Sequence, residues 1–175
     1  MKEYEFTLRF VIPSVESVSD DMVERLGDEG CDDALIGIGQ AGRIALEFAR
    51  ASDSAHSAIM SAIRDVRRVF PEAMLAEVTP DIVGLTDVAG MVGCSRQNMR
   101  KLLIARGARG PAPLHEGAPT LWHLAPLLDW LMHDKRYPIP DELLELSHAT
   151  MKVNTALDSL RTDDETRREL QALLA

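Results

Sequence analysis

The stretch Thr86–Leu103, TDVAGMVGCSRQNMRKLL, constrains the fold of this chain more than any other segment. Thr86 and Ser95 belong to the residue types that favour helix N-caps, and Gly93 lies between them, where a sharp turn can require a positive φ angle. This spacing predicts two short helices joined by a short turn.

The apolar residues of this stretch fall where two crossed helices would meet. Val88 and Val92 lie one turn apart on the first helix, and Met99 and Leu102 share one face of the second. Ala89 is small where the second helix must approach closely. The complete inward set is Val88, Ala89, Val92, Gly93, Cys94, Met99 and Leu102. Together these positions are typical of a helix-turn-helix.

The outward face of the second helix is polar and lacks carboxylates. It carries Ser95, Arg96, Gln97, Asn98, Arg100 and Lys101. All of these side chains can donate hydrogen bonds to base edges or phosphate oxygens, with Arg suited to guanine and Asn or Gln to adenine. The alternative is a solvated amphipathic helix packed on its own domain, but such a helix normally mixes in Glu or Asp. The pattern therefore favours DNA binding.

Charge is distributed unevenly along the chain. The formal net charge is -9, yet the interval Val88–His115 contains no Asp or Glu. The basic residues within that interval are Arg96, Arg100, Lys101, Arg106 and Arg109. A polyanion would be attracted to this interval and repelled by the rest of the chain.

The residues that follow predict a hairpin and a helix. Ala112–His115 and Thr120–His123 are expected to form its two strands, with a turn at Glu116–Pro119, and Leu124–His133 is expected to form the helix. Residues 83–133 thereby resemble the MerR-like winged helix-turn-helix superfamily and, within it, AlpA or excisionase-type DNA-binding domains. The matching residues are Pro111 and Pro113 in the link, Trp122 on the second wing strand, and Trp130 with Leu131 at the helix end.

This resemblance implies a recognition helix, Ser95–Ala105, in the major groove of double-stranded DNA. Wings of the family usually present Arg or Lys, whereas this wing tip offers His115 and the acidic Glu116. We therefore expect the recognition helix and its flanks to supply most of the affinity. The expected DNA-binding residues are Ser95, Arg96, Gln97, Asn98, Arg100, Lys101, Arg106, Arg109 and His115.

The first eighty residues predict the order βαββαβ of a ferredoxin-like domain. Tyr4–Phe10 alternates as a strand, Asp20–Glu29 reads as a helix, and Ser54 can cap a second helix that ends before Pro71. A last strand is expected at Ala73–Val78. Gly37, Gly39 and Gly42 spell GxGxxG, but the residues after Gly42 alternate as a strand, so we expect a hairpin and not a dinucleotide site.

No constellation of residues predicts catalysis, a cofactor or a metal site. Asp32 and Asp33 have no His, Ser or Cys partner nearby in sequence, so a solvated turn is expected there. His115, His123 and His133 lack Cys or carboxylate residues at ligand spacing. Cys31 and Cys94 are isolated thiols, expected to be reduced packing residues.

The C-terminal residues predict two more helices. Asp141 can cap the first of them, and Thr162–Glu165 has the form of a capping box for the second. Their leucines favour either packing against one of the preceding domains or a surface for a dimer or protein partner.

Together these patterns predict an α+β fold in three parts: a ferredoxin-like domain at 1–80 for dimerisation or regulation, a winged helix-turn-helix domain at 81–137, and C-terminal helices at 138–175. The expected function is sequence-specific DNA binding, as a transcriptional regulator that forms a homodimer. No apolar run long enough to span a membrane and no signal peptide are evident, so a cytoplasmic location is expected. The alternatives are a DNA-binding antitoxin, an excisionase-like accessory factor, or a winged domain that binds protein.

Overall fold

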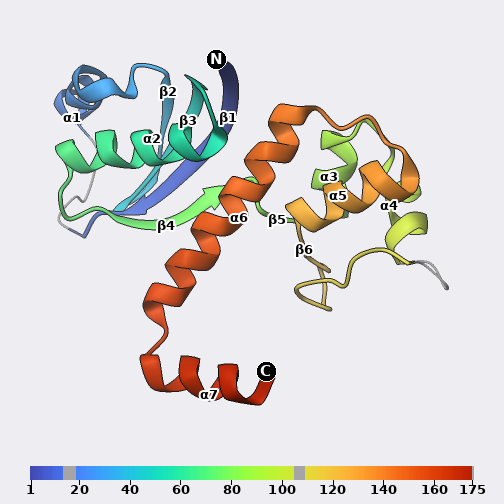
Figure 1. The fold of residues 1–175 in the computed structure, drawn as a ribbon. Helices are drawn as coiled ribbons and strands as arrows, with labels where there is room; N and C mark the ends of the chain where they lie inside the picture. The colour runs from blue at the N-terminus through green and yellow to red at the C-terminus, as the bar shows by residue number, and fades with distance from the viewer. Residues whose placement is uncertain (14–18, 105–108, 175) are drawn as a thin grey trace.

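The structure, a computed structural model, describes residues 1–13, 19–104 and 109–174, without the side chains of residues 38–40. It is a mixed α and β fold in which the first half of the chain forms a four-stranded antiparallel sheet. The sheet with its helices occupies one side of the molecule and a mainly helical unit the other, with a long helix between them (Figure 1).

The sheet consists of β1 (Lys2–Val11), β2 (Ala34–Gln40), β3 (Arg43–Ser52) and β4 (Met74–Thr79), in the order β2-β3-β1-β4. Alternating apolar residues drive this arrangement, because one face of each strand is buried. Phe6 of β1 lies opposite Phe48 of β3, and their rings stack with centroids 5.3 Å apart. The residues of β1 and β3 between these buried positions are mostly exposed, so the other face of the sheet is open.

Two helices lie against the buried face of the sheet: α1 (Asp20–Leu26) and α2 (Ala55–Val69) (Figure 1). Ser19 and Ser54 cap them by accepting hydrogen bonds from Met22 and Ser57 backbone N–H groups. The first helix is shorter than predicted. The α-helix ends at Leu26 and is followed by a π-helical turn, Gly27–Cys31, in which Gly30 takes a φ of 100°.

The glycines of the GxGxxG pattern lie in a hairpin. Gly42 has a φ of 71° in the turn between β2 and β3, a conformation that favours glycine. The strand β3 begins at the next residue and pairs antiparallel with β2. A strand, and not a helix N-terminus, therefore follows the third glycine.

A second hydrophobic core lies among β5 (Ile82–Val83), α3 (Leu85–Met91), α4 (Arg96–Leu103), β6 (Trp122–His123) and α5 (Leu124–Lys135). Trp122 is buried in it, and its indole Nε1 donates a hydrogen bond to the Pro111 carbonyl, 3.2 Å away. Four leucines of α5 are fully buried: Leu124, Leu127, Leu128 and Leu131.

The predicted wing strands are only partly correct. Ala112–His115 is not a strand, and His115 and Leu121 form a single isolated bridge. Trp122 and His123 pair instead with Val83 and Ile82, far earlier in the chain. Pro111 precedes the 112–115 segment and Pro113 lies within it. Because proline has no backbone N–H donor, this segment can form fewer hydrogen bonds with a neighbouring strand.

The helix α6 (Asp141–Arg161) lies between the two cores (Figure 1). Leu146 and Ala149 belong to the first core, whereas Leu143 and Leu144 pack against the second. The carboxylate of Glu145 accepts hydrogen bonds from the Tyr4 hydroxyl at 2.9 Å and from the Ala55 backbone N–H at 3.0 Å. Hydrogen bonds therefore join one side of α6 to both the sheet and the start of α2.

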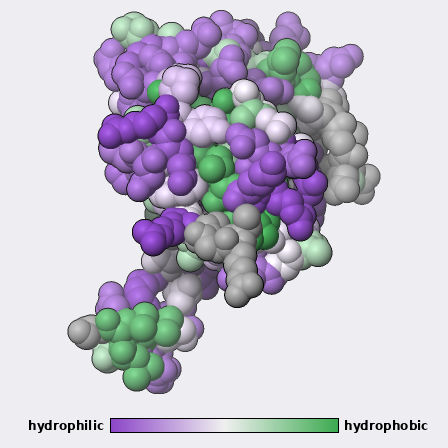
Figure 2. Space-filling view, turned by 90° about the vertical axis from the view of Figure 1, so that its right-hand side faces the viewer, coloured by the Kyte–Doolittle hydropathy of each residue, from purple (hydrophilic) through white to green (hydrophobic). Residues whose placement is uncertain are grey.

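The last helix, α7 (Asp164–Leu174), has no buried residue and projects from the rest of the molecule (Figure 1). Its cap differs from the predicted one, because Asp163 and not Thr162 accepts the hydrogen bond from Thr166 N–H, at 2.8 Å. Figure 2 shows hydrophobic residues gathered on the lobe formed by this end of the chain. The exposed leucines here are Leu160, Leu170, Leu173 and Leu174.

Across the described residues, no helix combines the length and the apolar character needed to cross a membrane.

Candidate nucleic-acid interface

The start of α3 differs from the sequence prediction. Gly84 and not Thr86 is the N-cap, and the helix begins at Leu85. Because glycine has no capping side chain, the Asp87 carboxylate satisfies the free backbone group by accepting a hydrogen bond from Gly84 N–H at 2.8 Å. This earlier start places Leu85 in the second core alongside Val88 and Ala89.

The turn between α3 and α4 has the geometry expected from its residues. Gly93 takes a φ of 68°, where a side chain would be strained. Cys94 N–H donates a hydrogen bond to the Ala89 carbonyl at 2.9 Å, which closes the turn. Met99 of α4 is completely buried with Val88 and Ala89 of α3, and Val92, Cys94 and Leu102 pack against the same core. The contacts hold α4 against α3 with its other face outward.

That outward face is exposed to solvent. All six polar residues expected on it have exposed side chains: Ser95, Arg96, Gln97, Asn98, Arg100 and Lys101. Two of them already have structural partners. Ser95 caps α4 by accepting a hydrogen bond from Asn98 N–H at 3.1 Å, and the Asn98 amide donates to the Tyr137 hydroxyl at 2.8 Å.

The remaining four residues, Arg96, Gln97, Arg100 and Lys101, are available for a ligand. Within the part of the chain that the structure describes, none of these side chains forms an ion pair or a hydrogen bond. Some other exposed arginines do form ion pairs, such as Arg161 with Asp158 at 3.2 Å and Arg9 with Glu77 at 3.4 Å. The basic residues of α4 therefore form an exposed positive surface without internal compensation.

The predicted flanking residues have different positions. Arg106 lies outside the described residues. Arg109 is exposed and precedes Gly110, whose backbone is so close to Leu103 that a Cβ there would lie 2.7 Å from the leucine side chain. Arg109 therefore lies next to the end of α4. His115 is exposed on the narrow 114–121 hairpin, with its ring over Gly117, in a separate segment from α4.

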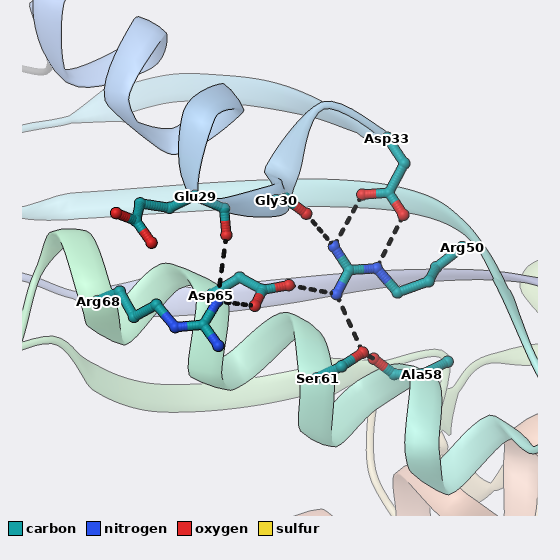
Figure 3. Close-up of polar contacts among 8 residues, drawn as sticks. All are labelled: Glu29, Gly30, Asp33, Arg50, Ala58, Ser61, Asp65 and Arg68. Carbon is teal, nitrogen blue, oxygen red and sulfur yellow. Dashed lines mark hydrogen bonds and ion pairs between the residues drawn. The ribbon is translucent and has the colours of Figure 1, made fainter.

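A buried polar cluster in the N-terminal unit was missed by sequence reasoning (Figure 3). Arg50 is 7% exposed, and its guanidinium donates to both carboxylate oxygens of Asp33, at 2.8 and 2.9 Å, and to Asp65 at 2.7 Å. Ser61 and the Gly30 carbonyl accept further hydrogen bonds from it. Asp32 and Asp33 lie in a turn, as predicted, but the Asp33 carboxylate is paired with Arg50 and is not simply solvated.

Electrostatics explain why this cluster is stable. Burial opposes the charge on Arg50, but the hydrogen bonds to Asp33 and Asp65 outweigh this effect and raise the Arg50 pKa above its ordinary value. Burial also raises the pKa of the neighbouring Cys31 thiol to about 12, with the Asp65 charge adding to the effect. A signal for Arg50 existed in the sequence, since it continues the inward-facing series Ile44, Leu46 and Phe48.

A second polar junction joins the two cores. Asp81 is 1% exposed, and its carboxylate lies 2.8 Å from His123 Nδ1 and accepts a hydrogen bond at 2.8 Å from the Asn154 amide.

His133 Nδ1 lies 2.8 Å from the Asp129 carbonyl. Among the residues described, no three His, Cys, Asp or Glu side chains are arranged to hold a metal ion.

Comparisons with known proteins give no match: no family model, no curated protein and no solved structure is similar to this chain.

Proposed function

We propose that this protein is a sequence-specific DNA-binding transcriptional regulator of the cytoplasm, with α4 as its recognition helix. One observation carries the proposal: α4 exposes Arg96, Gln97, Arg100 and Lys101 without ion-pair partners among the described residues. Uncompensated bases on one exposed face favour a polyanionic ligand. Gln97, between two arginines, adds a side chain able to recognise adenine.

The arrangement of α3 and α4 supports the same function. The glycine turn and the buried Met99 hold α4 so that its N-terminal half is outward. In helix-turn-helix proteins the corresponding half of the second helix contacts base edges in the major groove. Together with β6 and α5, these helices are consistent with a winged helix-turn-helix domain. The sheet order β2-β3-β1-β4, with two helices on one face, is in turn consistent with a ferredoxin-like domain.

We further propose that the protein acts as a homodimer. The helix α4 has only eight residues, so a single copy would read few base pairs, and a second copy would double the site. The exposed leucines of α7, Leu170, Leu173 and Leu174, offer an apolar surface outside both cores.

The test is selection from a pool of random DNA duplexes by the purified full chain. The proposal predicts enrichment of a palindrome with two half-sites about one helical turn apart. Recovery of no common sequence after repeated rounds would overturn the proposal of sequence-specific binding. Enrichment of a single half-site without a palindrome would overturn the homodimer while leaving the DNA-binding function in place.

A further inference from the structure

A cleft lies where the open face of the N-terminal sheet meets β6 and α6. All four strands of the sheet contribute residues. Segments beside the second core contribute Ile82, Leu114 and His123, and α6 contributes Asn154 and Thr155. None of the residues proposed to contact DNA lines this cleft. It is therefore a separate candidate site, at the place where the two halves of the molecule meet.

Two small residues, Gly37 and Ala45, form part of the floor of the cleft. Gly37 of β2 lies opposite Ala45 of β3, and Ala45 lies opposite Arg9 of β1. These residues form one row across the open face of the sheet. At Gly37 and Ala45 this row presents only backbone and a single methyl group. The next row of the same face carries the larger side chains of Leu35 and Glu47. The floor can therefore accept a flat group in contact with the sheet.

The facing wall combines two exposed aliphatic side chains with polar groups such as His123 and Asn154. Leu114 is 54% exposed and Ile82 is 44% exposed, and both line the cleft from the side of the second core. These two side chains offer apolar contact surface to a ligand that occupies the cleft. The small floor residues and the exposed aliphatic side chains together suit an aromatic ring, since ligand sites are mostly apolar with a few polar groups.

The charges of the lining determine which polar group the ligand carries. Every carboxylate there has a partner: Glu77 pairs with Arg9 at 3.4 Å, Asp81 bonds with Asn154 at 2.8 Å, and Asp158 pairs with Arg161 at 3.2 Å. Arg43 is exposed in the same lining, and none of the described residues forms an ion pair with it. Asp81 is only 1% exposed and holds two hydrogen-bonding partners, so Arg43 is the exposed charge that the described lining leaves unpaired. A guanidinium group binds carboxylates in a two-pronged geometry.

We propose that this cleft binds a small aromatic carboxylate, with its ring on the Gly37–Ala45 floor and its carboxylate on Arg43. The proposal goes beyond DNA binding and does not depend on it, because the site shares no residue with the surface of α4. An occupant would contact both the sheet and the segment that carries the 114–121 hairpin.

The experiment uses naphthalene-2-carboxylate as the probe and naphthalene-2-carboxamide as its neutral match. Binding of each to the full chain is measured by calorimetry, and the contact is located by backbone amide NMR. We expect the acid to bind and to shift the amides of Gly37 and Ala45, and the carboxamide to bind roughly tenfold more weakly. Equal affinity for the two probes, or no shifts at these amides, would overturn the proposal.

Two variants test the named contacts. Arg43→Gln is expected to lower the affinity for the acid about tenfold and to leave the affinity for the carboxamide unchanged. Arg64→Gln on α2, outside the cleft, is expected to change neither affinity by more than about twofold. Gly37→Leu should abolish binding by filling the floor, with Ala49→Leu on the same sheet face as its control. If Arg43→Gln binds the acid as tightly as Arg64→Gln does, Arg43 is not the anchor and the proposal fails.

Discussion

Asn154 of α6 forms two hydrogen bonds with the backbone of Val78: its Oδ1 accepts from the Val78 N–H at 2.9 Å, and its Nδ2 donates to the Val78 carbonyl at 2.8 Å. The Asn154 side chain thus supplies the hydrogen bonds that a neighbouring strand would otherwise make with β4, which lies at the edge of the sheet. A third hydrogen bond, at 2.8 Å, joins the same amide to the buried Asp81 carboxylate.

Asn154→Ala is expected to destabilise the protein substantially, because it leaves the Val78 backbone groups and the Asp81 carboxylate short of partners. Each unsatisfied buried group costs about 1–3 kcal/mol, so we expect a loss of roughly 3 kcal/mol. Urea unfolding of the full chain measures the loss. Gln171→Ala on the exposed α7 is the control, expected within about 0.5 kcal/mol of wild type. Equal stability of the two variants would show that the amide contributes nothing.

Arg50→Met is expected to lower the free energy of unfolding by about 3 kcal/mol, because it leaves the partly buried Asp33 carboxylate without its cation and Asp65 with Arg68 alone. Asp33 and Asp65 would then repel each other across the space that the guanidinium occupies (Figure 3). Denaturant unfolding compared with Arg64→Met, an exposed arginine on α2, measures the effect. A loss no greater than that of the control would contradict the importance of the cluster.

Glu145 should make stability depend on pH in acid. The hydrogen bond from Ala55 N–H, together with those from Tyr4 and Lys2, lowers the Glu145 pKa below its ordinary value of 4.5. A lowered folded-state pKa gives stability that is present above the ordinary value and is lost as the pH falls through the folded one. Glu145→Gln should therefore lose stability at pH 7 and show a weaker acid dependence, measured by thermal melts from pH 7 to pH 3. Glu169→Gln, exposed on α7, should keep the wild-type profile; if both variants keep it, Glu145 has no such role.

The exposed leucines of α7 are expected to hold the homodimer together. Leu173→Glu combined with Leu174→Glu should give a monomer by light scattering at a concentration where the wild type is a dimer. Gln171→Glu combined with Ala172→Glu adds the same charge to the same helix, and we expect it to remain a dimer. A wild-type protein that is monomeric at micromolar concentrations would rule out the dimer itself.

Local patterns predicted much of the fold, because they depend on neighbouring residues. Alternation placed the four strands, and the spacing of Val88, Ala89 and Met99 placed two helices with a turn at Gly93. The six exposed residues of α4 also followed from this spacing, since a helix that buries Met99 must present the opposite face to solvent.

Features that depend on distant residues were missed. The partners of Arg50 are 17 and 15 positions away, and Asn154 bonds to a residue 76 positions earlier. The pairing of β6 with β5 likewise joins segments about 40 residues apart, so the local hairpin expected at 112–123 could not reveal it. The cleft beside Arg43 forms only when α6 and the second core meet the sheet.

The most direct test of the central claim is the affinity of the selected duplex for Arg96→Ala combined with Arg100→Ala, measured across a salt series. Both side chains are exposed and without partners among the described residues, so the fold, followed by Trp fluorescence, should stay intact. We expect affinity to fall roughly a hundredfold and its salt dependence to weaken. Arg25→Ala combined with Arg64→Ala removes the same charge from α1 and α2 and should bind like wild type. If the α4 variant binds as tightly as this control, α4 does not read DNA.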